Sequence, residues 1–167
     1  MRKARGFTLV EVLIVVVLLG ILATTVISMA SGGAISAKES ALATDLQLLR
    51  RFMLVYKCHH LEVGPGYPNG QTSAAPTEQA FIDQATLSSN SAGQTAAIGT
   101  PGFERGPYMQ KIPVNPLNNK STIQMLGDGE NFPAADDSHG WICKPATSEI
   151  RADSAGSDNS GKPYYDY

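Results

Sequence analysis

The stretch that most constrains this chain lies at its start, where residues 6–29 are GFTLVEVLIVVVLLGILATTVISM. Glu11 is the only ionisable side chain within it, and three cations lie just before it, in residues 2–5. At a rise of about 1.5 Å per residue, a helix of this length crosses a hydrocarbon layer about 30 Å thick. Basic residues that precede a span stay on the cytoplasmic side, so we expect the rest of the chain to be exported.

Glu11 and the junction Gly6–Phe7 set this stretch apart from an ordinary membrane anchor. An unpaired carboxylate inside a span costs about 2.5–3.5 kcal/mol on insertion scales, so Glu11 needs a partner. Gly6–Phe7 is a flexible junction that a protease at the cytoplasmic face could reach. Cleavage there would give Phe7 a new ammonium group close to the depth of Glu11. Opposite charges on neighbouring copies would then pair, which predicts self-assembly.

Residues 5–12, RGFTLVEV, resemble the start of the type IV pilin and pseudopilin superfamily. The resemblance implies that a prepilin peptidase cuts after Gly6 and methylates the new amine of Phe7. It also implies that Glu11 recruits the subunit into a helical filament. Ser28 is a departure, because many members have a helix-kinking proline there, and we expect Gly32–Gly33 to supply the flexible point instead.

The same resemblance predicts the organisation of the chain. Residues 1–6 would be a leader peptide, residues 7–31 a transmembrane and filament-core helix, and residues 32–167 a periplasmic pseudopilin domain. Two simpler interpretations stay open for the first 30 residues. They could form a secretory signal peptide cleaved near Ser28-Met29-Ala30, or a plain signal anchor with an incidental glutamate.

After the apolar run, residues 35–57 form an amphipathic helical pattern. Apolar residues recur at intervals of four and three, which places them on one helical face. They are Leu42, Leu46, Leu49, Met53 and Tyr56. No proline interrupts residues 7–57, so we expect one long helix whose upper half buries this face against a globular domain.

The remaining chain predicts a small sheet with one further helix. Pro76–Leu87 should be a short helix capped by Thr77, and residues 88–106 a surface loop. We expect strands at 122–126, 140–143 and 149–152, the last two joined by a hairpin turn. Segments 48–68 and 106–119 resemble type II secretion pseudopilins. The predicted fold is α+β, a long helical spine with a small antiparallel sheet.

Charge argues against one class of partner. The net charge is −2, and removal of residues 1–6 lowers it to −5. A mildly acidic exported domain without a basic cluster binds nucleic acid poorly, so no nucleic-acid partner is expected.

The two cysteines and three histidines fall in two places, Cys58-His59-His60 and His139 with Cys143. An exported domain permits oxidation, which favours a Cys58–Cys143 disulfide, although separate buried thiols explain the pair equally well. Cysteine and histidine also suit zinc. A spacing of four residues in a strand, as between His139 and Cys143, does not bring two ligands together.

The C-terminal tail is rich in oxygen atoms that could bind a metal ion. Major pseudopilins bind calcium near their sheet, so the resemblance implies a calcium site here with Asp153 and Asp158 as ligands. A solvated acidic tail is the alternative, and the second acidic loop with Asp128, Asp136 and Asp137 has the same two interpretations.

No catalytic motif stands out, so we expect a structural protein rather than an enzyme. The resemblance is greatest to the major pseudopilin of a type II secretion system. It implies a single-pass inner-membrane protein that is assembled with further copies into a periplasmic filament. Its other partners would be the prepilin peptidase, minor pseudopilins and the inner-membrane secretion platform. A type IV pilin for adhesion, motility or DNA uptake remains an alternative, as does an exported or anchored soluble domain.

Overall fold

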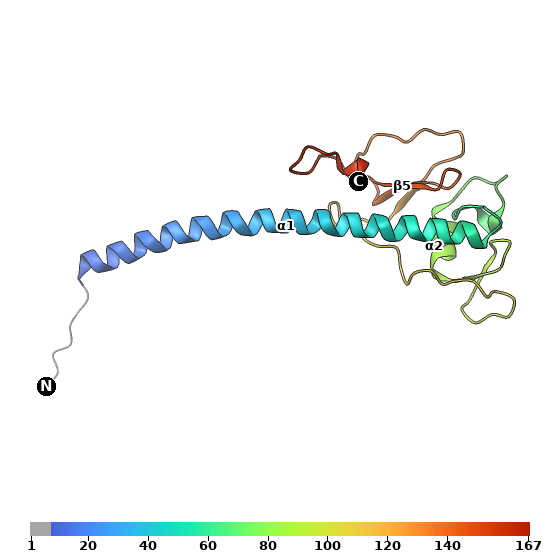
Figure 1. Cartoon of the computed structure of the whole chain (residues 1–167), viewed down its shortest axis with the longest axis horizontal. Helices are drawn as coiled ribbons and strands as arrows, with labels where there is room; N and C mark the ends of the chain where they lie inside the picture. The colour runs from blue at the N-terminus through green and yellow to red at the C-terminus, as the bar shows by residue number, and fades with distance from the viewer. Residues whose placement is uncertain (1–7) are drawn as a thin grey trace. The chain divides into compact units, whose positions relative to one another are not determined.

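The computed structural model describes residues 8–167, with the side chains of residues 24–32 excepted. The chain divides into two compact units, Met1–Lys38 and Glu39–Tyr167. The elements, several of which are labelled in Figure 1, are α1 (Leu9–His59), η1 (Pro68–Gly70), α2 (Glu78–Thr86), β1 (Ser88–Ser89), β2 (Thr95–Ala96), β3 (Ile123–Met125), β4 (Trp141–Lys144), β5 (Glu149–Ala152) and η2 (Tyr164–Asp166).

Helix α1 has 51 residues and confirms the prediction of one long helix. It continues without a break through Gly32–Gly33, so the paired glycines do not end the helical hydrogen bonding there. Lys57 and His59 lie in its last turn. Basic side chains at this end of a helix interact favourably with the negative end of the helix dipole.

The second helix begins where the sequence predicts. Thr77 is the N-cap of α2, and its hydroxyl oxygen accepts a hydrogen bond from the Ala80 N–H at 3.2 Å. Glu78 in the first turn accepts a bond from the Ile123 N–H at 2.8 Å, which ties α2 to β3. Cap and carboxylate thus fix both the start of α2 and its position against the sheet.

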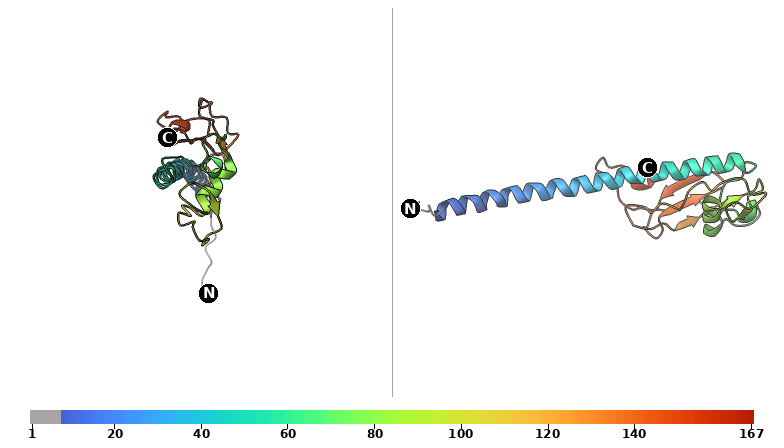
Figure 2. Two further views of the ribbon diagram at one scale, coloured as in Figure 1. Left: turned by 90° about the vertical axis from the view of Figure 1, so that its right-hand side faces the viewer. Right: turned by 90° about the horizontal axis from the view of Figure 1, so that it is seen from below.

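The three-stranded sheet has the order β3-β4-β5 and lies beside the C-terminal part of α1 (Figure 2). β4 and β5 are antiparallel, as predicted, with Trp141 opposite Ala152. β3 and β4 are parallel, which corrects the expectation of a purely antiparallel sheet. The reason is the connection over residues 126–140, which carries the chain back to the side where β3 began.

Two turns show local features that residue type alone left open. The segment predicted as a loop contains a short hairpin, in which β1 pairs antiparallel with β2. The side chain of Asn90 closes it by accepting bonds from the N–H groups of Ala92 and Gln94 at 3.0 and 3.1 Å. Ser148, in the β4–β5 turn, has a φ of 56°, a conformation that glycine adopts more readily.

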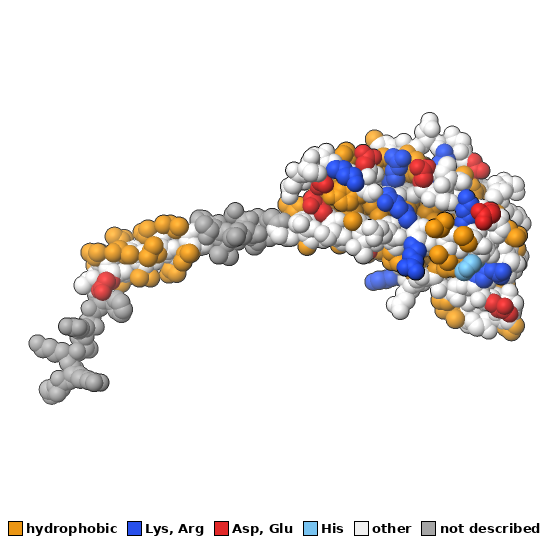
Figure 3. Space-filling model, viewed as in Figure 1, with side chains coloured by type: hydrophobic (Ala, Val, Ile, Leu, Met, Phe, Trp, Pro, Cys, Tyr) orange, Lys and Arg blue, Asp and Glu red, His pale blue; other side chains and the backbone are white. Residues whose placement is uncertain are grey.

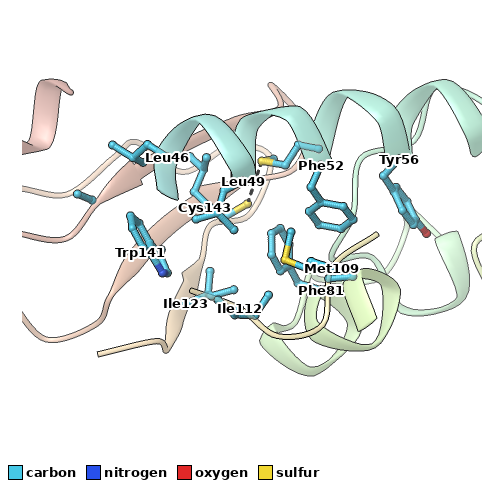
Figure 4. Packing of buried hydrophobic residues seen from close by; sticks show 14 of the residues in the cluster. Leu46, Leu49, Phe52, Tyr56, Phe81, Met109, Ile112, Ile123, Trp141 and Cys143 are labelled. Atoms are coloured by element: carbon cyan, nitrogen blue, oxygen red, sulfur yellow. Dashed lines mark hydrogen bonds between the residues drawn. The ribbon is translucent and has the colours of Figure 1, made fainter. Parts of the chain in front are cut away.

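The hydrophobic core lies entirely within the second unit. The five apolar positions predicted on one face of α1 are all buried, at 0–1% exposure. Figure 4 shows this face packed against residues from the sheet, α2 and the segment that precedes β3. The sheet contributes Trp141, Cys143 and Ile150, and α2 contributes Phe81. Burial of these large side chains is the main force that holds the second unit together.

Candidate assembly site

Thr8 and Glu11 form the start of α1, in the first unit. The Glu11 carboxylate accepts two bonds through Oε2, from the Thr8 N–H at 2.9 Å and from the Thr8 hydroxyl at 2.8 Å. The Thr8 hydroxyl oxygen in turn accepts a bond from the Glu11 N–H at 3.2 Å. This reciprocal arrangement is a capping box, which satisfies donors that a helix start otherwise leaves without partners.

The capping box is a site feature that our sequence analysis missed, although the spacing Thr-x-x-Glu at residues 8–11 encodes it. Glu11 is therefore held in a defined position by its own subunit. The predicted processing residues, Gly6 and Phe7, lie outside the described residues.

Large apolar side chains precede and follow Glu11 along α1. Each is at least half exposed, on all sides of α1, and together they form the orange band of Figure 3. They are Leu9, Val10, Val12, Leu13, Ile14, Val15, Val16, Val17, Leu18, Leu19, Ile21 and Leu22. A helix that is apolar all round is stable only when lipid or other apolar helices cover it. Over the described residues, no helix combines the length and the hydropathy of a membrane span.

Comparison with known proteins identifies the family. Residues 1–30 match the prokaryotic N-terminal methylation motif. The type II secretion system core protein G of Klebsiella pneumoniae is 30% identical over 131 residues, which cover 78% of this chain and 80% of the relative. This chain belongs to the type II secretion system core protein G family. The core protein G of Pseudomonas aeruginosa is 28% identical over 161 residues, 95% of this chain and 98% of the relative. No solved structure matches the chain significantly.

The family match explains the function of the motif at residues 5–12. The methylation motif that covers residues 1–30 indicates processing by a prepilin peptidase, and it includes the capping box. The chain is thus a pseudopilin that carries its family's processing signal beside an exposed apolar helix.

The structure does not form the predicted disulfide. Cys58 and Cys143 are both free thiols, the first exposed and the second buried. Cys143 Sγ lies 4.0 Å from Met53 Sδ, on the buried face of α1. Cys58 follows Met53 by five residues, a rotation of about 140° around the helix, so its side chain leaves that face. Burial raises the pKa of the Cys143 thiol and keeps it protonated.

The two predicted calcium ligands belong to separate hydrogen-bond networks. Asp153 is fully buried, and its carboxylate accepts bonds from the Asp136 N–H, the His139 N–H and the Ser138 hydroxyl at 2.9, 2.7 and 3.2 Å. These bonds leave Asp153 occupied as a structural anchor for the loop before β4.

Asp158 instead organises the turn near the C-terminus. Its Oδ1 accepts bonds from the Ser160 N–H, the Ser160 hydroxyl and the Lys162 N–H, and its Oδ2 accepts one from the Tyr167 hydroxyl. The hydrogen bonds from Ser160 and Tyr167 lower the pKa of this carboxyl to about 2. Asp153 and Asp158 therefore do not fit a shared calcium site. Among the described residues, no three His, Cys, Asp or Glu side chains form a group that could hold a metal ion.

Ser138, His139 and Asp153 come together in a way that the sequence did not suggest. The Ser138 hydroxyl lies 2.8 Å from His139 Nδ1, and this same ring nitrogen lies 3.9 Å from Asp153 Oδ2. A catalytic triad needs the serine and the carboxylate on different ring nitrogens, so that the imidazole can relay a proton. This cluster is therefore part of the Asp153 anchor, with the geometry of a structural contact.

Proposed function

We propose that this chain is the structural subunit of a type II secretion pseudopilus, which polymerises through α1 to support protein export. Family membership supports the secretion system, and the match over residues 1–30 supports processing by a prepilin peptidase. The observation that carries the proposal is the exposed apolar surface of residues 9–22, which contains a single carboxylate. Such a surface has to be covered by lipid before assembly and by neighbouring subunits afterwards.

Processing and assembly are connected through charge. Cleavage after Gly6 would give Phe7 a positive amino terminus, and Glu11 is the nearest carboxylate in the sequence. Among the described residues, the Glu11 carboxylate accepts hydrogen bonds from Thr8 of its own subunit. In a filament, we propose that Glu11 exchanges these bonds for the methylated amine of Phe7 on a neighbouring copy. The pair would be surrounded by apolar side chains, where a salt bridge is worth more than it is in water.

The partners and location follow from this proposal. The subunit would wait in the inner membrane with residues 7–31 as its anchor and residues 32–167 in the periplasm. It would meet the prepilin peptidase before assembly, and minor pseudopilins and the inner-membrane platform during it. In this role the subunit contributes surface and mechanical continuity to a filament and catalyses no reaction.

The amino terminus of the mature chain, measured by mass spectrometry on protein from its native host, tests the proposal. We expect a chain that starts at Phe7 and carries an N-methyl group. A chain that starts near Ser31 would show removal of an ordinary signal peptide, and the assembly role of Glu11 would be lost with the segment that carries it.

A further inference from the structure

The turn that follows α1 has an unusual backbone conformation. Leu61 and Glu62 have φ angles of 55° and 64°, in the left-handed region that glycine adopts most readily. Hydrogen bonds hold the turn in this shape, because the Glu62 N–H donates to the Lys57 carbonyl oxygen at 3.1 Å. The Val63 N–H likewise donates to the His60 carbonyl oxygen at 3.0 Å. Helix ends of this kind usually have glycine in the left-handed position, so two larger side chains here need a reason.

Both side chains of this turn are exposed. Leu61 is 78% exposed, so it contributes little to the core. Glu62 is also exposed, and among the described residues it forms no ion pair. Residues held in left-handed conformations cluster at functional sites, which favours a contact of this turn with another molecule. We refer to Leu61 and Glu62 together as the knob.

A groove beside α1 has chemistry that matches the knob. It has a volume of about 310 Å³ and is lined by Leu48, Arg51, Phe52, Val55 and Tyr108. Leu48 is 44% exposed, and the centroids of the Phe52 and Tyr108 rings lie 5.5 Å apart, so most of the lining is apolar or aromatic. Arg51 is exposed and forms no ion pair within the part of the chain that the structure describes. An apolar side chain beside a carboxylate is therefore the ligand that this groove suits.

The knob and the groove lie at different places on one chain. Neither Leu61 nor Glu62 lines the groove of its own copy. Arg51 and Leu61 are ten residues apart, which corresponds to about 15 Å along the helix axis at a rise of about 1.5 Å per residue. Two complementary surfaces at different places on a subunit form a head-to-tail contact. Contacts of this type build open helical filaments when the rotation between copies does not close a ring.

We propose that the knob of one copy docks in the groove of a second copy, with Leu61 in its apolar part and Glu62 paired with Arg51. The proposal rests on polymerisation through α1, the function proposed above, because parallel copies shifted along a common axis bring the two surfaces together. The second unit thus carries an assembly surface of its own, separate from Glu11.

This contact supplies the register that the apolar part of α1 lacks. Residues 9–22 expose apolar side chains on all sides, and burial of apolar surface is non-directional, so it does not select one register between neighbouring helices. A leucine that fills a groove beside an ion pair does select one. The contact is small, and it forms because α1 already holds neighbouring copies at a high effective concentration.

The first test is disulfide cross-linking of filaments in the native host. Val55→Cys and Leu61→Cys are combined in one chain, with Cys58→Ser to remove the exposed native thiol. Oxidation with copper phenanthroline should give a ladder of dimers, trimers and larger oligomers, because every copy carries both halves of the contact. The matched control replaces Leu61→Cys with Ile98→Cys, at another highly exposed apolar residue, and should give no ladder.

Two results of the cross-linking would overturn the proposal. One is a variant that forms normal filaments and gives no ladder. The other is a cross-linked band whose mass is not a multiple of the mass of this chain, because the groove would then hold a different protein.

The second test reverses the charges of the proposed ion pair. Arg51→Glu and Glu62→Arg should each lower the filament yield at least about threefold, because each places like charges opposite one another. The combined variant should regain at least about half of the normal yield, since the opposite charges face each other again. Normal filaments from both single variants, or a combined variant no better than either, would contradict the contact.

These tests separate the contact from the proposed function on which it rests. An unmodified chain that forms no filament would contradict polymerisation itself. Filaments that depend on Glu11 and are unaffected by every change in the knob and the groove would contradict the docking contact alone.

Discussion

The two units of the molecule differ in how they cover the apolar side chains of helix α1. Residues 9–22 of α1 are apolar apart from Glu11 and are exposed. The face of α1 formed by Leu42, Leu46, Leu49, Met53 and Tyr56 is instead buried against the sheet and α2. Both stretches belong to one continuous helix, so helix formation alone does not distinguish them. The difference is the partner, because the second unit supplies its own cover and the first has to obtain it from lipid or from other subunits.

The polar groups of the two units differ in the same way. In the second unit, buried polar side chains such as Asp153 and Asn115 have all of their bonds within the fold. In the first unit, the partner of Glu11 among the described residues is Thr8, at the start of the helix. The second unit thus satisfies these polar groups within one chain, whereas the proposed partner of Glu11 comes from a neighbouring copy.

The substitution with the largest expected effect is Glu11→Ala. It should reduce filament formation at least tenfold and leave processing after Gly6 intact, because the proposed pairing between subunits depends on this carboxylate. Electron microscopy of filaments and mass spectrometry of the amino terminus measure the two effects separately. Asp166→Ala, at an exposed carboxylate of the second unit, is the control, and normal filaments from Glu11→Ala would contradict the assembly role.

A pair of leucine substitutions compares the two stretches of α1 directly. Leu49→Ala should destabilise the second unit by about 2–5 kcal/mol, because it leaves a cavity in a packed core. Leu18→Ala should change the free energy of unfolding of that unit by less than about 0.5 kcal/mol. Chemical denaturation followed by Trp141 fluorescence measures both. A comparable loss in the two variants would mean that residues 9–22 support the second unit after all.

Asp153→Ala tests the buried anchor of the loop before β4. It leaves two N–H groups and a hydroxyl without their acceptor, so we expect a loss of about 1–3 kcal/mol. Asp166→Ala, at an exposed carboxylate, should have almost no effect on the same denaturation curve. A neutral Asp153→Ala would show that water replaces the carboxylate without cost.

Substitution of the two N-cap threonines, Thr77 and Thr8, should change the stability of the second unit by a smaller amount and again distinguish the two units. Thr77→Ala should destabilise the second unit by about 1 kcal/mol, and Thr77→Ser should retain most of the stability. Thr8→Ala should leave unfolding of the second unit unchanged, because its cap serves the first unit alone. The midpoint of urea unfolding distinguishes these outcomes, and a stable Thr77→Ala would exclude a role for the cap.

The smallest effect expected is a pH dependence from His60. The His60 ring is buried and stacks on the Tyr56 ring, with 3.7 Å between the ring centroids. Its Nε2 lies 2.9 Å from the Ser89 hydroxyl oxygen. Burial lowers the pKa of His60, so below about pH 6.5 the unfolded state binds a proton that the folded state does not. Stability should therefore fall as the pH drops from 7 to 5. His60→Gln should flatten this dependence and the exposed His59→Gln should not, and an unchanged profile for His60→Gln would contradict the assignment.

The buried face of α1 could be predicted from residue spacing. The intervals of four and three from Leu42 to Tyr56 determine a buried helical face wherever the partner lies, and the structure confirms all five positions. The cap at Thr77 and the pair β4–β5 were also predictable, because a cap and a hairpin turn depend on residues a few positions apart.

The sheet topology and the roles of the polar residues were not predictable in this way. The parallel pairing of β3 with β4 depends on the path of the loop between them, which has no periodic pattern. The sequence left open whether Cys58 and Cys143 form a disulfide or remain separate thiols, because it cannot show that one is exposed and the other buried. The same holds for Asp153 and Asp158, whose donors come from different segments of the chain.

The sequence by itself therefore determined the elements encoded by neighbouring residues, namely the apolar helix, its amphipathic continuation, the capped second helix and the motif that places the chain in its family. Only the tertiary structure decided where the strands pair, which acidic residues are buried and which residues line the groove beside α1. The physical reason is the separation in sequence between the residues that contact each other. Helical periodicity and caps arise from contacts within a few residues, whereas Asp153 and Cys143 acquire their partners only when distant segments pack together.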